Sequence, residues 1–225
     1  MAGKRWYNDG CAVSHALDLI GDRWALPVVR ELLLGPKRFT DLRSGLPGAS
    51  PDMLSQRLRE LRQAGVVRQH RLPPPAAAWV YELTEWGAEL APVVTQLGRW
   101  GGRSPLLRHD IHSSVDSLML SLRATFDPEA AAGAAMAVAL RLGDDRFRVR
   151  IAGGAIRVER GDIDRPDVVL DTDSHTLDDL LYGGMDLESA VHAGTVRVTG
   201  THAVAQRFLD LFPLPDQVPA VSERD

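Results

Sequence analysis

The residues best suited to chemistry lie in one short segment, residues 50–65. Ser55, Gln56 and Arg59 offer a hydroxyl, an amide and a guanidinium within two helical turns. Such groups form hydrogen bonds with base edges in the major groove of DNA. Leucines spaced i, i+4 and i+7 fall on the opposite face of the same helix: Leu54, Leu58 and Leu61. The spacing predicts an amphipathic helix with a polar outer face, a pattern that many ordinary surface helices share.

Residues at both ends of this helix predict where it begins and ends. Ser50 supplies an N-cap oxygen, Pro51 suits the first helical position, and Gly65 permits a left-handed stop. A short helix at 39–44 and a turn at 45–49 precede it, so the order predicts a helix-turn-helix.

Two further helices are predicted before this pair. Residues 11–20 read as a helix with Val13, Leu17 and Ile20 inward. Asp22 is suited to cap a second helix that runs to Leu34, and its predicted buried set is Trp24, Val28, Leu32 and Leu33. Pro27 lacks a backbone donor, so we expect a bend or a late helix start there.

A hairpin is predicted directly after the polar helix. Residues 66–72 and 78–83 read as its strands, and Pro73, Pro74 and Pro75 form the loop between them. Residues 84–100 then read as one helix capped by Thr84. Its apolar surface exceeds what a small domain buries, which favours a partner helix from a second subunit.

Charge divides the chain. Residues 1–105 hold 14 Lys and Arg against 10 Asp and Glu, a balance of +4, whereas residues 106–225 hold 12 against 20, a balance of −8. A polyanion is therefore expected to meet the first half.

Length and composition set the broad class. The 225 residues, 44% of them hydrophobic, suffice for two globular domains, which we place at 1–103 and 104–225. A secretory signal and a membrane span are not expected. The single cysteine, Cys11, excludes an internal disulfide and fits a reducing cytoplasm.

The first half resembles a known family, the HxlR-type winged-helix transcriptional regulators. The resemblance covers about residues 8–100 and rests on Cys11, 16–24, 30–32, 38–42, Ser50, 53–61, 64–68 and 81–87, in order and with family spacing. It implies a homodimer on double-stranded DNA, with two recognition helices in successive major grooves. We expect Ser55, Gln56 and Arg59 to face bases. The other predicted DNA-binding residues, mostly suited to phosphates, are Arg38, Thr40, Ser50, Asp52, Arg57, Arg62, Arg68 and Arg71.

The second half has a different pattern. A helix at 114–126 is followed by strands at 136–142, 147–151 and 156–158, which form a predicted antiparallel meander. A fourth strand at 168–171, helices at 176–182 and 186–193, a fifth strand at 195–200 and a helix at 202–212 complete it. The predicted fold class of the whole chain is α+β.

This order resembles the sterol-carrier-protein type-2-like lipid-binding domain over about residues 112–212. The resembling stretches are 167–173, 177–184, 187–190 and 195–200. The resemblance implies an apolar cavity between a five-stranded sheet and its helices. Candidate lining residues, which equally suit a filled core, are Leu118, Met119, Leu122, Phe147, Leu180, Leu181, Phe208 and Phe212.

Other candidate sites are weaker. Cys11 suits a redox sensor, although burial as a small hydrophobe is favoured over a reactive thiolate. His109 and His112 lack further ligands for zinc, and the aspartate pairs at 162–164 and 171–173 lack the pattern of a calcium loop. No nucleophile elbow, phosphate loop or dinucleotide fingerprint is present, so no metal, cofactor or enzymatic activity is expected.

The leading hypothesis is a cytoplasmic, dimeric DNA-binding regulator whose second domain binds a small apolar ligand. The first alternative is a lipid carrier or protein-interaction module whose winged helix only dimerises. A further alternative is a thiol-based redox sensor that acts through Cys11.

Overall fold

The computed structural model describes residues 6–108, 111 and 113–219. It divides into two compact units, Met1–Val94 and Thr95–Asp225, each of which is described by itself. No helix among the described residues is long and apolar enough to cross a membrane.

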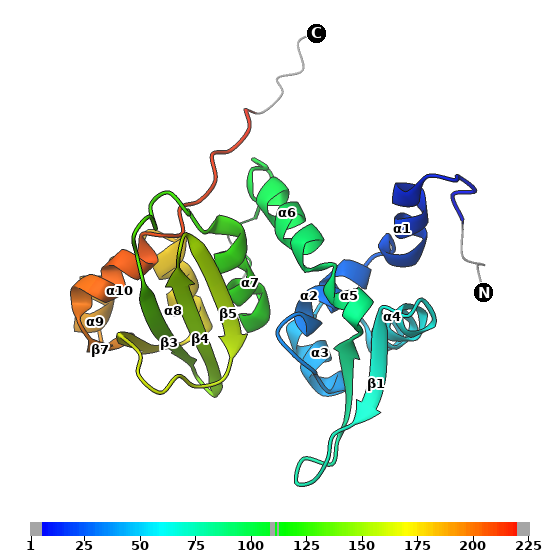
Figure 1. Cartoon of the computed structure of the whole chain (residues 1–225), viewed down its shortest axis with the longest axis horizontal. Helices are drawn as coiled ribbons and strands as arrows, with labels where there is room; N and C mark the ends of the chain where they lie inside the picture. Colours follow the sequence, from blue (N-terminus) through cyan, green and yellow to red (C-terminus); the bar gives the residue numbers. More distant parts are fainter. Residues whose placement is uncertain (1–5, 109–110, 112, 220–225) are drawn as a thin grey trace. The chain divides into compact units, whose positions relative to one another are not determined.

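The first unit is a winged helix-turn-helix (Figure 1). Its elements are α1 (Ala12–Ile20), α2 (Ala25–Leu32), α3 (Phe39–Gly45), α4 (Pro51–Gln63), β1 (Val67–Arg71), β2 (Trp79–Leu83) and α5 (Glu85–Ala88). β1 and β2 pair as an antiparallel hairpin, from Val67 opposite Leu83 to Arg71 opposite Trp79. We call the β1-β2 hairpin the wing. Lys37 and Tyr81 exchange two backbone hydrogen bonds of 2.9 and 2.8 Å, so the segment before α3 adds a short third strand to it.

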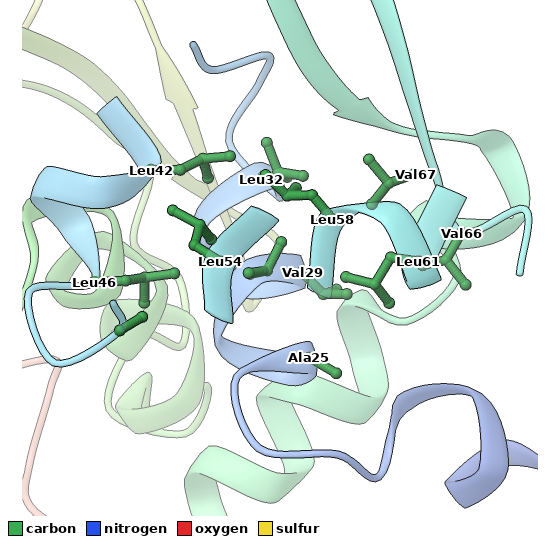
Figure 2. Close-up of a cluster of buried hydrophobic side chains, with 12 residues drawn as sticks. Ala25, Val29, Leu32, Leu42, Leu46, Leu54, Leu58, Leu61, Val66 and Val67 are labelled. Atoms are coloured by element: carbon green, nitrogen blue, oxygen red, sulfur yellow. The ribbon is translucent and has the colours of Figure 1, made fainter. Parts of the chain in front are cut away.

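The core of this unit lies between α2, α3, α4 and the wing. Apolar side chains from the three helices point toward one another (Figure 2). The fully buried members include Ala25, Val28, Val29, Leu42, Leu54 and Leu61. Burial of the predicted apolar face of α4 leaves its polar face outward.

Prolines set two helix boundaries. Pro27 lies in the first turn of α2, where the missing backbone donor has no partner to lose, so the predicted late start is confirmed. The single helix predicted at 84–100 is wrong, because α5 ends at Ala88 and α6 (Ala91–Gly102) begins three residues later. The ring of Pro92 would clash with the carbonyl four residues earlier, that of Ala88, in a continuous helix.

The prediction that Val13 and Leu17 of α1 point inward is also wrong. Val13 is 66% exposed and Leu17 is 43% exposed, whereas Asp18 is buried and accepts a hydrogen bond from the backbone N–H of Tyr7 at 3.0 Å. The apolar stripe of α1 therefore faces outward in the isolated chain.

The second unit combines one sheet with helices. Its remaining elements are α7 (Val115–Thr125), β3 (Met136–Leu142), β4 (Asp145–Ala152), β5 (Ala155–Arg160), β6 (Val168–Thr172), α8 (Ser174–Leu181), α9 (Leu187–His192), β7 (Arg197–Gly200) and α10 (His202–Leu209). The strand order is β5-β4-β3-β6-β7. β3 and β6 are parallel and the other neighbours are antiparallel, so the predicted meander of three strands is confirmed.

One face of this sheet is packed against helices. α7, α8 and α10 lie on the same side of the strands in Figure 1, and Val138, Leu140, Val149 and Leu170 of that face are fully buried. Side chains at the alternate positions of each strand point to the opposite face.

Candidate nucleic-acid interface

The outer face of α4 presents the predicted base-reading groups together. Ser55, Gln56 and Arg59 are exposed on this helix, as are Asp52 and Arg62. The Oγ atom of Ser50 accepts a hydrogen bond from the backbone N–H of Met53 at 3.3 Å, so Ser50 acts as the N-cap. Gly65 has a φ of +74°, as predicted for the left-handed stop after the helix. The residues Ser50 and Gly65 therefore fix where the exposed face begins and ends.

Glu60 restrains one of these groups. The Nε2 atom of Gln56 donates to Oε1 of Glu60 at 3.0 Å, one helical turn along. This contact holds the amide on the outer side of α4, although it occupies one of the donors that a base edge would use.

Arg57 does not belong to this face. Only 6% of the residue is exposed, and its guanidinium donates to Oδ2 of Asp22 at 2.7 Å and also to Glu60. The prediction that Arg57 contacts phosphates is therefore wrong for this conformation. Its position in the helical repeat places it beside Leu54, Leu58 and Leu61 on the inward side.

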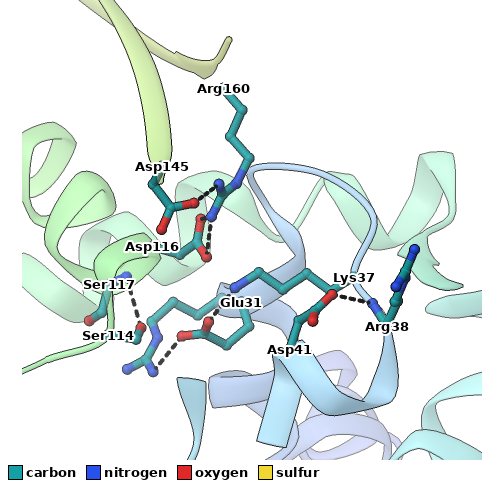
Figure 3. A network of polar contacts seen from close by, with 10 residues as sticks. Glu31, Lys37, Arg38, Asp41, Ser114, Asp116, Ser117, Asp145 and Arg160 are labelled. Carbon is teal, nitrogen blue, oxygen red and sulfur yellow. Dashed lines mark hydrogen bonds and ion pairs between the residues drawn. The ribbon is translucent and has the colours of Figure 1, made fainter. Parts of the chain in front are cut away.

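A buried carboxylate joins α2 to the segment before α3. Glu31 is fully buried, and its carboxylate accepts from Arg30 at 2.9 Å and from Nζ of Lys37 at 2.6 Å (Figure 3). A Cβ atom at Gly45 would lie 2.4 Å from Oε2 of Glu31, so the end of α3 packs directly onto this carboxylate. Sequence reasoning assigned no role to Glu31, since its burial depends on contacts between helices.

The start of α3 also carries predicted contacts. Arg38 and Thr40 are exposed, and the backbone N–H of Arg38 donates to Oδ2 of Asp41 at 3.0 Å (Figure 3). The Asp41 carboxylate thus satisfies a backbone donor at the helix start. The guanidinium of Arg38 is left on the surface.

The wing holds its arginines by local contacts. The side chain of Arg68 is 65% exposed and pairs with Glu82 on the opposite strand, where Nδ1 of His70 also lies 3.3 Å from Glu82. Nε of Arg71 donates to the carbonyl of Ala77 at 3.2 Å. Both arginines are accessible, but the charge of Arg68 is shared with a carboxylate.

Cys11 is exposed, which contradicts the favoured prediction of burial. It is the N-cap residue of α1, and the nearby backbone N–H groups of Ser14 and Val13 lower the pKa of its thiol. Asp9 accepts from the backbone N–H of Cys11 at 3.1 Å and from Oγ of Ser14 at 2.7 Å. The backbone N–H groups in the first turn of α1 therefore favour a thiolate.

Large apolar side chains remain on the surface along α5 and α6. Trp86 is 51% exposed and Trp100 is 76% exposed, while Val93 and Leu97 lie between them in the chain and are also exposed. The spacing of Val93, Leu97 and Trp100 puts them on one face of α6. An apolar stripe of this size is typical of an interaction surface.

In the second unit, seven of the eight predicted ligand-lining residues are buried and Leu181 is half-buried. The rings of Phe208 and Phe212 are in edge contact, with centroids 5.0 Å apart. An open hollow of about 550 Å³ lies elsewhere, between β6, α9 and β7. It is lined by Asp171, Thr172, Asp173, Thr195 and Arg197 among others, and by none of the eight.

The histidines and aspartates considered as metal ligands lie only partly within the described residues. His109, Asp110 and His112 lie outside the residues that the structure describes. Within the described ranges, no group of three or more His, Cys, Asp or Glu side chains could hold a metal ion. Asp173 instead caps α8, accepting from the backbone N–H groups of His175 and Thr176 at 2.8 and 2.9 Å.

Two different family models match the chain, one after the other. The family model described as HxlR-like helix-turn-helix matches residues 19–105, and the model described as alkyl sulfatase C-terminal matches residues 112–219. The second domain thus carries a different family description from the sterol-carrier resemblance.

Relatives of the first domain are bacterial regulators. The HTH-type transcriptional regulator YvaP of Bacillus subtilis, itself uncharacterized, is 36% identical over 85 residues, which are 38% of this chain and 79% of YvaP. YybR of the same organism is 38% identical over 96 residues, which are 41% of this chain and 74% of YybR. Among solved structures, the redox regulator HypR in its oxidized form is 33% identical and has a TM-score of 0.40, covering 43% of this chain and all of HypR.

The matches to YvaP and YybR exceed 30% identity over more than two thirds of each relative. The family model spans residues 19–105, which include the helix-turn-helix and wing described above. The chain therefore belongs to the HxlR-like helix-turn-helix family of transcriptional regulators.

Proposed function

We propose that this regulator acts as a homodimer that places α4 of each subunit in the major groove of double-stranded DNA. The observation that best supports this proposal is the outer face of α4. There Ser55, Gln56 and Arg59 project from a helix whose apolar side is fully buried. A hydroxyl, an amide and a guanidinium on a rigid helix suit direct readout of base edges. Arg59 suits a guanine in particular, since a guanidinium pairs with its two acceptor atoms.

Phosphate contacts would then fix the orientation of α4. Arg38, Arg62, Arg68 and Arg71 are exposed around it, and Thr40, Ser50 and Asp52 lie near the starts of α3 and α4. Backbone N–H groups at helix starts are themselves suited to phosphate oxygens. We assign Arg57 to the fold of the domain instead, because it pairs with Asp22.

Dimerisation would cover the exposed apolar stripes. Val93, Leu97 and Trp100 on α6 and Val13 and Leu17 on α1 are surfaces that a second subunit can bury. Analytical ultracentrifugation of the wild-type chain and of Leu97→Glu tests this. We expect the wild type to sediment as a dimer and Leu97→Glu to shift toward monomer, with Glu188→Gln as a control on the exposed surface of α9.

The DNA assignment is tested with a duplex selected from a random library by the wild-type chain. Arg59→Ala should bind the selected and unrelated duplexes with nearly equal affinity, whereas Arg207→Ala, on exposed α10 of the second domain, should retain discrimination. If both variants discriminate equally well, α4 does not read the bases through Arg59.

For the second domain we propose a small apolar effector held between the sheet and its helices, as in a sterol-carrier-like domain. Support comes from the apolar residues Leu118, Met119, Leu122 and Phe147, which are buried on the helix-covered side of the sheet. An effector changes DNA affinity only if it binds one arrangement of the dimer better than the other. Native mass spectrometry of the purified chain tests retention of lipid, and Met119→Trp, which fills that space, should abolish it.

The geometry of Cys11 favours a second candidate function, a thiol-based sensor. The thiol is exposed, and the backbone N–H groups of Ser14 and Val13 lower its pKa. An accessible thiolate is what oxidants and electrophiles attack. The test is the DNA affinity of wild type and Cys11→Ser before and after an electrophile. A loss of affinity confined to the wild type supports sensing, and equal behaviour rejects it.

A further inference from the structure

The open face of the sheet in the second domain carries six arginines, and we name it the arginine face. Because side chains alternate along each strand, the residues between the buried positions point away from the helices. Its members are Arg141 on β3, Arg146, Arg148 and Arg150 on β4, Arg157 on β5 and Arg197 on β7. The register places Arg141 opposite Arg146 and Arg150 opposite Arg157.

The charge of this face opposes that of its surroundings. Residues 106–225 hold 12 basic and 20 acidic side chains, yet the strands of the arginine face carry six of the 12 against Glu159 and Asp171, with Asp167 just before β6. Physiological salt screens charges over about 8 Å. The acidic excess elsewhere in the domain therefore does not cancel the positive potential at this face.

Most of these arginines are available. Arg148 donates to Oε2 of Glu159 at 2.9 Å, and Arg146 donates to the carbonyls of Gly143 and Asp145 in its own hairpin. Within the part of the chain that the structure describes, the other four take part in no ion pair: Arg141, Arg150, Arg157 and Arg197. All four are exposed.

Two cross-strand pairs of this face do not stabilise the fold, although Asp171 lies opposite Arg141 and Arg197, and Glu159 lies opposite Arg148. Like charges directly opposite each other on neighbouring strands are destabilising, and two such pairs occur on one face. The hydrogen bond from Arg148, with the charges of Arg148, Arg157 and Arg150, holds the pKa of Glu159 below its usual value. The carboxylate thus responds to a concentrated positive charge that an anionic ligand would also meet.

We propose that the arginine face is a second DNA-binding surface, which contacts the phosphate backbone beside the sequence that α4 reads. This inference rests on the proposed function, because it requires that the first domain bring the chain to DNA. Successive arginines on β4 lie about 6.8 Å apart, twice the strand rise. A DNA strand carries one phosphate per about 3.4 Å of helix axis, so arginines spaced along β4 can contact different phosphates.

The composition of the face favours DNA over an acidic protein. Between the arginines lie small side chains, among them Ala137, Ala139, Ala155 and Thr199, and no described position of this face is aromatic. Protein interfaces are anchored by buried aromatic and apolar residues. Interfaces with DNA phosphates are polar and positively charged.

The test measures fluorescence anisotropy of the full chain on a selected duplex extended by about 20 base pairs, or two helical turns, as salt is varied. Arg150→Gln/Arg157→Gln removes two charges from the arginine face. Arg165→Gln/Arg207→Gln removes two exposed charges elsewhere in the same domain. Arg150→Lys/Arg157→Lys keeps the charge. Melting temperatures of all three check that they fold.

We expect the Gln pair on the arginine face to lower the slope of log K against log salt by about 1.8, or 0.9 for each lost contact. The Lys pair and the control pair should keep the wild-type slope. Equal slopes for the Gln pair and the control would overturn the inference while leaving the proposed function intact. Absence of wild-type binding to any duplex would instead refute the proposed function, and the inference with it. If only polyglutamate binding falls in the Gln pair, the face takes an acidic protein.

Discussion

The guanidinium of Arg57 donates to the carboxylate of Asp22 at 2.7 Å, across 35 residues of chain. This contact ties the inward side of α4 to the segment that precedes α2. The recognition helix therefore has one arginine that serves the fold, Arg57, two residues before the arginine proposed to read DNA, Arg59.

Replacement of Arg57 should affect stability more than DNA readout. Arg57→Ala leaves Asp22 and Glu60 without their cation and should lower the free energy of unfolding by about 1–2 kcal/mol, a value reduced for the exposure of Asp22. Urea denaturation measures this. Arg59→Ala is the matched control and should change stability by less than about 0.5 kcal/mol. Equal losses in both variants would contradict the structural role of Arg57.

Gly87 should be intolerant of any side chain. A Cβ atom there would lie 2.1 Å from the backbone carbonyl of Val66, which cannot move without disturbing the start of β1. Gly87→Ala should therefore cost about 1–3 kcal/mol of overpacking, measured by urea denaturation. Gly101→Ala, whose Cβ meets nothing within 4 Å, is the control and should be neutral or slightly stabilising. A neutral Gly87→Ala would show that α5 does not pack as described.

Release of Arg68 from Glu82 should strengthen DNA binding. Glu82→Gln removes the carboxylate that shares the charge of Arg68, so we expect tighter binding to every duplex and a salt slope steeper by up to about 1. The same substitution in an Arg68→Ala background is the control, and there the gain should disappear. A gain that persists without Arg68 would assign the effect to general charge.

The reactivity of Cys11 should depend on one backbone donor. Backbone N–H groups lower the pKa of the Cys11 thiol, so alkylation by iodoacetamide should reach half its maximal rate at a lower pH than alkylation of free cysteine in the same buffer. Ser14→Pro removes the N–H that contributes most and should move the midpoint to higher pH. Ser14→Ala keeps that N–H and should move it less. Equal midpoints for the two variants would show that the N–H is not the cause.

Much of the fold could be predicted because its signals are local. Ser50 and Gly65 bound α4, and alternation of apolar residues predicted the strands of the second domain. The failures concern information that lies elsewhere in the chain or outside it. Arg57 is inward because Asp22 meets it, and Glu31 is buried because Lys37 and Gly45 accommodate it. Val13 and Leu17 face outward in the isolated chain, where no second subunit is present.

The arginine face shows a different limit. Alternating arginines predicted that β4 has one polar side, but only the register reveals that Arg150 lies opposite Arg157 and Arg141 opposite Arg146. A net charge counted over the domain conceals this concentration, because acidic residues outnumber basic ones in the sequence as a whole.

The most direct measurement is the dissociation constant of the wild-type chain for its library-selected duplex and for an unrelated duplex, across a range of salt concentrations. We predict tighter binding to the selected duplex by at least about 10³-fold, and affinity for both that falls linearly in log K against log salt. Loss of that preference in Arg59→Ala should follow. Absence of any salt-dependent affinity, for either duplex, would contradict a role in reading DNA.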